Sequence, residues 1–131
     1  MKPIKLAQEI KDLIAEIQQE DIPIIVEGRN DKKALQELGL DNIFTLNLPL
    51  FKIVERIHTK EVVILTDLDK KGKELYRRIA HDCIHHGIKV NNRLRHFLFK
   101  ETQLAHIEGL PRYLKNLERK EILRPRSSKR A

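Results

Sequence analysis

Two short, unbroken apolar runs constrain the fold of this chain more than any other feature. Residues 24–26 read IIV and residues 62–65 read VVIL, so both runs are rich in β-branched side chains. A strand that is apolar at consecutive positions is buried on both faces, which is typical of parallel sheets. The two runs are separated by amphipathic, helix-like stretches. The sequence therefore predicts a sheet enclosed between layers of helices.

Strand-like and helix-like segments alternate through the first 90 residues. The patterns predict strands over residues 23–28, 43–46, 61–66 and 88–90. They predict helices over 3–20, 31–39, 50–59 and 71–86, with Asn30 as the N-cap of the second helix, and further helical segments near 94–99 and 111–122. Such alternation predicts a Rossmann-like α/β fold, with a parallel sheet of about four strands and helices on both faces.

The length of 131 residues suits one compact domain. We expect a helix at residues 1–21 packed on a main α/β unit of residues 22–110, followed by a basic C-terminal helix and flexible tail at 111–131. Residues 111–131 hold 8 Lys and Arg against 2 Asp and Glu, whereas residues 1–110 carry a net charge of only +1. A basic arm suits a partner with a phosphate backbone, although a solubilising tail would carry the same charge.

Several classes of protein do not fit this composition. The chain contains no apolar run near the roughly 20 residues that a membrane span needs. Its N-terminus, MKPIKLAQEIKDLI, is charged throughout and does not resemble a secretory signal. Cys83 is the single cysteine, so no internal disulfide can form. We expect a cytoplasmic protein without a membrane partner.

Acidic residues follow both apolar runs. Glu27 comes directly after the first run, Asp31 lies one helical turn further on, and Asp67 and Asp69 follow the second run. Ligands of parallel α/β sheets bind beyond the carboxyl ends of the strands, so these acids should converge at one edge. Carboxylate oxygens suit Mg²⁺, and a cation would offset their mutual repulsion. The sequence predicts a site for Mg²⁺, with Mn²⁺ as the alternative ion, at Glu27, Asp31, Asp67 and Asp69.

The stretches IIVEGRNDKKAL (24–35) and VVILTDLDKKGKEL (62–75) resemble the two signature motifs of the Toprim domain. This catalytic fold is shared by topoisomerases, bacterial-type primases and several nucleases. The resemblance spans roughly residues 22–90 and is nearest to small Toprim proteins, among them the ribonuclease that matures 5S ribosomal RNA and an archaeal family of short proteins.

This resemblance implies a role for each matching residue. Glu27 corresponds to the glutamate proposed as general acid or base, and Asp67 and Asp69 correspond to the pair that holds Mg²⁺. Asp31 matches the further acid of the nuclease-like branch. Gly28 and Gly72 match the motif glycines, and each is predicted to leave room for a close turn beside the site.

Basic residues follow both acidic motifs. Positive charge near a helix N-terminus is disfavoured by the helix dipole, so phosphate contact explains these residues better than helix stability does. A solvated helix face is the alternative. The predicted nucleic-acid-binding residues are Arg29, Lys32, Lys33, Lys70, Lys71 and Lys73, together with Arg124, Arg126, Lys129 and Arg130 near the C-terminus.

The favoured function is Mg²⁺-dependent phosphodiester hydrolysis, with RNA cleavage or processing favoured by the nuclease-like resemblance. Two alternatives stay open: a non-catalytic module that binds nucleic acid or a ribonucleoprotein, and primase-like nucleotidyl transfer with a partner. A topoisomerase is disfavoured because the chain has only two tyrosines, of which Tyr76 is expected to pack in a helix. We further hypothesise that a C-terminal extension containing His106 and Glu108 packs over the site.

Overall fold

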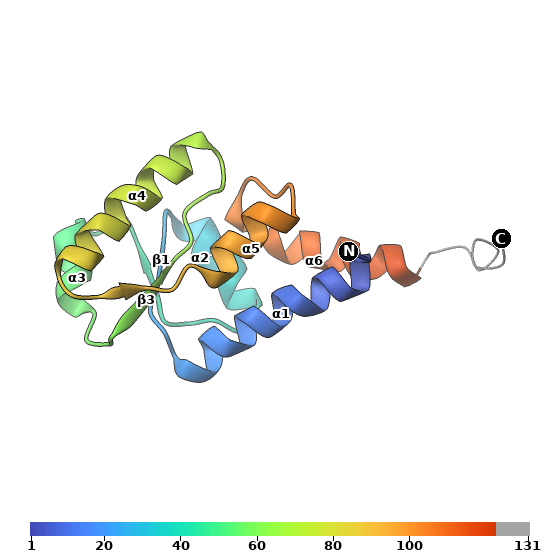
Figure 1. The fold of residues 1–131 in the computed structure, drawn as a ribbon, viewed down its shortest axis with the longest axis horizontal. Coiled ribbons are helices and arrows are strands. Elements are labelled where there is room, and N and C mark those ends of the chain that lie inside the picture. Colours follow the sequence, from blue (N-terminus) through green and yellow to red (C-terminus); the bar gives the residue numbers. More distant parts are fainter. Residues whose placement is uncertain (123–131) are drawn as a thin grey trace.

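The structure is a computed structural model that describes residues 1–122. Within these residues, four parallel strands form one sheet in the order β2-β1-β3-β4 (Figure 1). The strands are β1 (Ile24–Val26), β2 (Ile43–Thr45), β3 (Glu61–Ile64) and β4 (Lys89–Val90). The helices are α1 (Pro3–Glu20), α2 (Arg29–Glu37), α3 (Leu50–Arg56), α4 (Lys70–His85), α5 (Arg93–Glu101) and α6 (Leu110–Ile122), with a short 3₁₀ helix, η1 (Ile107–Gly109), before α6. The predicted parallel α/β sheet is confirmed.

The two central strands are buried on both faces, as their unbroken apolar runs predict. Successive side chains of a strand point to opposite faces, so each run supplies both layers of the core. One face receives Ile24, Val26, Val63 and Leu65, and the other receives Ile25, Val62 and Ile64. Ile25 of β1 pairs with Ile64 of β3, which fixes the register between the strands.

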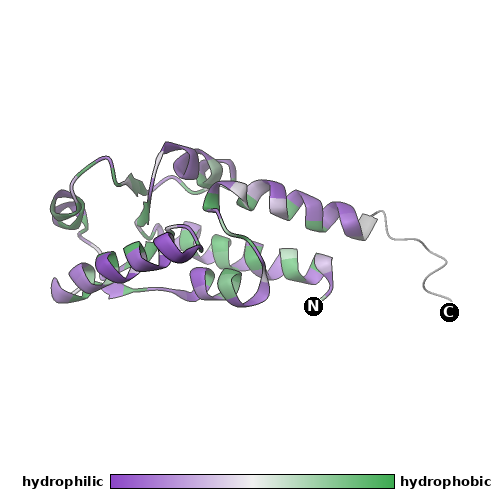
Figure 2. Cartoon of the chain, turned by 90° about the horizontal axis from the view of Figure 1, so that it is seen from above, coloured by the Kyte–Doolittle hydropathy of each residue, from purple (hydrophilic) through white to green (hydrophobic). Residues whose placement is uncertain are grey.

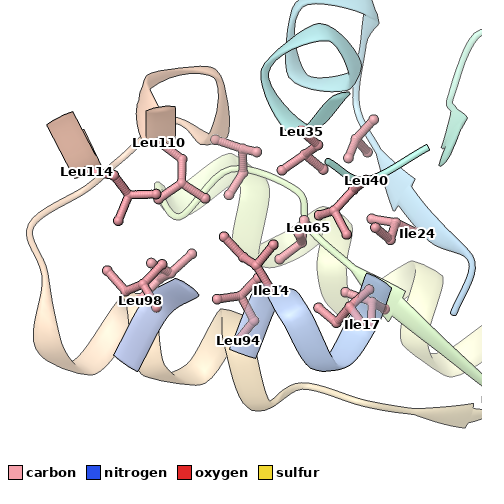
Figure 3. Close-up of a cluster of buried hydrophobic side chains, with 14 of the residues drawn as sticks. Ile14, Ile17, Ile24, Leu35, Leu40, Leu65, Leu94, Leu98, Leu110 and Leu114 are labelled. Carbon is pink, nitrogen blue, oxygen red and sulfur yellow. The ribbon is translucent and has the colours of Figure 1, made fainter. Parts of the chain in front are cut away.

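Each face of the sheet is covered by its own set of helices. The larger core lies under α1, α2, α5 and α6, whose apolar side chains meet those of β1 and β3 (Figure 3). Figure 3 shows Ile14 of α1 beside Leu94 of α5 in this layer, with Leu98 on one side of the pair and Ile17 on the other. The smaller core lies between the opposite face and helices α3 and α4. Helix α1 therefore packs on α5 and α6 as well as on the sheet, and Lys11 pairs with Glu118 of α6.

The strand order places a switch point between β1 and β3. The connection from β1 leads outward to β2 on one side, while β3 and then β4 extend the sheet on the other side. In such sheets the crevice at the carboxyl ends of the two central strands is where ligands bind. Glu27 directly follows β1, and Asp67 follows β3 by three residues. The fold thus brings both acidic motifs to the same edge.

The largest differences between the predicted and observed helix boundaries are in α2 and α3. Helix α2 begins at Arg29 with Gly28 as its N-cap, not after Asn30, because the Asp31 side chain turns back and accepts a hydrogen bond from the Gly28 N–H at 3.0 Å. Helix α3 ends at Arg56 instead of residue 59, because the backbone of Ile57 is already extended. Neither change alters the position of the acidic motifs.

The helices are amphipathic, with hydrophobic residues turned toward the core. Figure 2 shows α6, the helix that leads into the grey trace, as alternating hydrophilic and hydrophobic stripes. None of the helices in residues 1–122 combines the length and the apolar character required to cross a bilayer.

Candidate metal and nucleic-acid site

The carboxylate of Glu27 spans the gap between the two central strands. Its Oε2 atom accepts a hydrogen bond of 2.7 Å from the backbone N–H of Asp67, 40 residues further along the chain. The side chain of Glu27 is half-buried, as is that of Asp67. A charge-assisted bond of this length ties the end of β1 to the loop after β3 and fixes the orientation of the carboxylate.

The carboxylate of Asp67 is held by the segment that follows α5. Its Oδ1 accepts a bond of 2.9 Å from the Ile107 N–H, and its Oδ2 lies 3.3 Å from Nδ1 of His106. The same segment accepts a bond at the Ala105 carbonyl from the Leu68 N–H, at 2.8 Å. The hypothesis that a C-terminal extension packs over the site is therefore confirmed for residues 105–107.

Asp69 serves as the N-cap of α4. Its Oδ1 accepts a bond of 2.8 Å from the Gly72 N–H, which satisfies one of the unpaired donors at the helix start. Its other carboxylate oxygen lies 3.9 Å from Nδ1 of His106. The local fold of this motif thus needs an oxygen acceptor at Asp69 whether or not a cation is bound.

Asp67, Asp69 and His106 form a cluster of metal-ligand size. One ligand atom from each lies within 4.8 Å of the others. The hydrogen bond to Asp67 raises the pKa of the exposed His106 imidazole above its ordinary value, because the bond and the neighbouring negative charges favour the protonated ring. Two carboxylates and an imidazole are ligands that divalent cations such as Mn²⁺ accept, while Mg²⁺ prefers the oxygens alone. The donor set therefore fits a divalent metal ion.

Glu27 and Asp31, also predicted as metal ligands, lie beside this cluster and outside it. Asp31 is 9% exposed, and one of its carboxylate oxygens accepts the hydrogen bond that caps α2. Burial raises the pKa of the Asp31 carboxyl, and the nearby charges of Asp67, Glu27 and Glu108 raise it further. Glu27 faces the backbone of Asp67. The structure gathers all four acids at one edge of the sheet. Of these, Asp67 and Asp69 lie close enough to His106 for the three residues to hold one metal ion.

Arg95 is a buried residue of the site that the sequence analysis missed. Its guanidinium donates to the carbonyl of Thr66, to that of Asp67 at 2.9 Å and to that of Gly72 at 3.5 Å, and it lies 4.6 Å from the ring centroid of Tyr76. Burial lowers the pKa of the guanidinium, although nearby acids oppose the change. A sequence signal existed, because Arg95 stands beside the core residues Leu94 and Leu98 on the buried side of α5.

The two motif glycines differ in what they do. A Cβ at Gly72 would lie 1.9 Å from the carbonyl oxygen of Asp67, so only glycine fits this close approach. At Gly28 a Cβ would meet nothing in the described residues within 4 Å, and its φ of −149° is accessible to any residue. The predicted close turn is confirmed at Gly72 and wrong at Gly28.

The predicted phosphate-binding residues surround the acids unevenly. Arg29, Lys33, Lys70 and Lys71 are exposed, and Lys32 is half-buried. The ammonium of Lys73 lies 4.2 Å from the centroid of the Phe99 ring, which is a cation–π contact. Arg124, Arg126, Lys129 and Arg130 lie outside the described residues.

Comparison with known proteins agrees with this arrangement. A family model for the Toprim domain matches residues 21–92. The UPF0292 protein of Methanocaldococcus jannaschii is 36% identical, over 84% of this chain and 90% of its own length. The UPF0292 protein of Thermoplasma volcanium is 35% identical, over 77% of this chain and 89% of its own length. A solved structure of a protein from Aquifex aeolicus has a TM-score of 0.70 at 29% identity, covering 77% of this chain and 94% of that one.

These matches give the acidic edge a family context. Toprim domains bind divalent metals, and this chain carries its metal-sized cluster at the end of β3, within and just beyond the matched residues. The family also associates the chain with nucleic acid. The chain belongs to the Toprim domain family, together with the archaeal UPF0292 proteins that it resembles over most of its length.

Proposed function

We propose that this protein hydrolyses phosphodiester bonds of nucleic acid with the help of Mg²⁺ or Mn²⁺. The observation that carries the proposal is the cluster of Asp67, Asp69 and His106 directly beside the carboxylate of Glu27. A metal position next to a group able to move a proton is the minimum that metal-assisted hydrolysis needs. The resemblance to nucleases within the family favours RNA as the substrate.

Asp67 and Asp69 would hold the cation, with Asp31 and Glu27 contributing negative charge around it. When bound, the cation supplies Lewis-acid polarisation of a phosphoryl oxygen and charge for the leaving group. Oδ2 of Asp67 and the outward oxygen of Asp69 both face His106, so the chain presents these atoms together at one point.

Glu27 would act as the general acid or base. The bond from the Asp67 N–H to Oε2 holds the carboxylate in place, which leaves Oε1 as the atom that we assign to proton transfer. The open space at Gly28 leaves room for a phosphate backbone beside Glu27. Arg29 and Lys70 begin α2 and α4 at this edge and would contact the phosphates on either side.

The first test replaces Glu27 by glutamine. The amide oxygen can still accept the bond from the Asp67 N–H, so the fold is retained while proton transfer is lost. We expect cleavage of labelled RNA in Mg²⁺ to fall by about 10²- to 10⁴-fold. The assay uses hairpin and single-stranded RNA and their DNA counterparts, with Mg²⁺, Mn²⁺ or EDTA. Glu55→Gln, an exposed acid on α3, is the matched control and should cleave like the wild type. Equal cleavage by Glu27→Gln would remove Glu27 from the mechanism.

The second test separates the two cations at His106. Imidazole is a good ligand for Mn²⁺ and a poor one for Mg²⁺, so His106→Gln should weaken Mn²⁺ binding on the order of tenfold and leave Mg²⁺ binding nearly unchanged. Calorimetric titration of each ion measures both constants. An equal loss for the two ions would show that His106 acts by orienting Asp67 and does not bind the metal.

A second candidate function, a binding module without catalysis, is favoured by one observation. Each of the four acids accepts a hydrogen bond from a backbone N–H, so they also stabilise the local fold: Glu27, Asp31, Asp67 and Asp69. Nucleic-acid binding that survives the double variant Asp67→Asn and Asp69→Asn, together with no cleavage of any substrate by the wild type, would decide for the module. Nucleotide incorporation in a polymerisation assay would instead support primase-like transfer.

A further inference from the structure

A hollow lies beside the acidic cluster, between α4 and α5. It has a volume of about 380 Å³, within the range of roughly 300–1,000 Å³ that small-ligand pockets occupy. Leu68, the residue between the two aspartates of the motif, forms part of its wall. The hollow and the acidic cluster therefore share the loop of residues 67–69.

Positive charge dominates the lining of this hollow. Lys73 and Arg77 of α4 face Arg95 and His96 of α5, and no carboxylate lines it among the described residues. The groove between α2 and α6 is larger, at about 610 Å³, but it combines its cations (Lys33, Arg112, Lys115 and Arg119) with the carboxylates of Glu37 and Glu108. An anionic ligand is thus better matched by the hollow between α4 and α5.

The same hollow also presents aromatic surface. Tyr76 and Phe99 both line it, and Phe99 is 52% exposed although it is a large apolar residue. The chain is poor in aromatic residues, with 5% in total and no tryptophan. Two of these few rings are gathered in one positively charged hollow next to the acidic motif. Flat apolar surface combined with cationic groups matches the two halves of a nucleotide, its base and its phosphate.

We propose that this hollow binds one unpaired base of a nucleic-acid strand whose adjacent phosphate lies at the acidic cluster. The base stacks on Phe99, and Arg77 and Lys73 contact the phosphates beside it. This inference rests on the proposed function for the position of the strand. It adds that the protein recognises a single-stranded position next to the bond that it cleaves.

The ammonium of Lys73 covers the Phe99 ring in this structure, and an incoming base would have to replace it there. An exposed cation–π pair is weaker than the stacking of a base on an aromatic side chain, so a base can displace the ammonium from the ring. The released Lys73 then meets the phosphate that arrives with the base, which compensates for the lost contact. Lys73 lies in the first turn of α4, whose N-cap is Asp69, so the movement of its side chain stays close to Asp69.

The test measures stacking directly. A short single-stranded RNA carries one 2-aminopurine, whose fluorescence is quenched when the base stacks, and the chain has no tryptophan to interfere. Binding is measured with the full chain in EDTA and again with Ca²⁺, so that cleavage does not consume the probe. We expect quenching with the wild type, and an affinity for Phe99→Leu that is roughly 5- to 150-fold weaker without quenching.

Two further variants keep the result specific to the ring. Phe99→Tyr should keep both affinity and quenching, because it keeps an aromatic face and adds no tryptophan. Phe51→Leu is the matched control, since Phe51 is 61% exposed on α3 and lines a different hollow; it should bind like the wild type. Wild-type affinity for Phe99→Leu, or equal quenching in that variant, would overturn the proposal. So would binding of a free mononucleotide as tight as that of the oligonucleotide.

Quenching that depends on Phe99, with no metal-dependent cleavage, would support the base-binding hollow and contradict the proposed nuclease activity. Cleavage that depends on Glu27 without any effect of Phe99 would do the reverse.

Discussion

Replacing Asp67 by asparagine is expected to lower the cleavage rate in Mg²⁺ by about a thousandfold, which corresponds to ~4 kcal/mol of transition-state stabilisation. Asparagine keeps an oxygen that can accept the bond from the Ile107 N–H, so the loop retains its shape. It removes the negative charge that a divalent cation needs. Rates measured on labelled RNA under single-turnover conditions give the comparison, with Asp82→Asn, an aspartate more than three turns further along α4, as the matched control.

Thermal unfolding gives a second measure that does not require a substrate. Added Mn²⁺ or Mg²⁺ stabilises the folded wild type in proportion to RT ln(1 + [M]/Kd), so its Tm should rise with metal concentration. The Asp67→Asn protein should show little of this rise. In EDTA its Tm should stay close to that of the wild type, because the removal of one of several crowded negative charges is offset by the loss of the pairing between Asp67 and His106. Undiminished cleavage together with an undiminished metal-dependent rise in Tm would place the cation elsewhere.

Replacing Gly72 by alanine is expected to lower the free energy of unfolding by about 3 kcal/mol, despite the ~1 kcal/mol that alanine normally gains over glycine inside a helix. The new Cβ would lie 1.9 Å from the Asp67 carbonyl oxygen and 2.5 Å from its carbon. These are backbone atoms, so the first turn of α4 must shift. The shift would disturb both the bond from the Gly72 N–H to Asp69 and the bond from the Thr66 hydroxyl to the Gly72 carbonyl.

Urea unfolding measures this loss, and Gly28→Ala is its matched control. Gly28 is the glycine of the other motif and caps α2, but a Cβ built there has no neighbour within 4 Å in the described residues, so the control should unfold within about 0.5 kcal/mol of the wild type. A Gly72→Ala protein as stable as this control would show that the loop after β3 can relax without loss.

The part of the site that lies at the strand ends could be predicted from the sequence, for a physical reason. The runs that end before Glu27 and Asp67 are apolar at every position and rich in β-branched residues, which is typical of a strand buried on both faces. Parallel strands align their carboxyl ends, so two acids far apart in the chain must meet at one edge. The hydrogen bond between Glu27 and the Asp67 backbone is the outcome of that rule.

The sequence predicts that the segment containing His106 packs over the site, but it does not predict the contacts of Arg95 and His106. Hydrophobic patterns show which side of a helix is buried and do not show which distant atoms its polar side chains reach. Arg95 reaches the Asp67 carbonyl across 28 residues, and His106 reaches the Asp67 carboxylate across 39. Both come from the chain after residue 91, where the hydrophobic periodicity weakens. The start of α2 differs from the prediction for a related reason. The helix begins at Arg29 with Gly28 as the N-cap, because the Asp31 side chain turns back to accept the Gly28 N–H, and the sequence does not show that Asp31 rather than Asn30 turns inward.

The contacts of Asp67 have a consequence for modular evolution. The segment that matches the family ends at residue 92, whereas Arg95, His106 and the Ile107 N–H all belong to the chain beyond it. The shared motifs therefore supply the acids, and the appended segment supplies the groups that orient and partly neutralise them. A recombination that moved only residues 21–92 into another gene would therefore transfer the acids without the groups that hold Asp67 here. Under the metal-binding role proposed for His106, two proteins with identical motifs would then differ in ion preference through a segment that the motifs do not include.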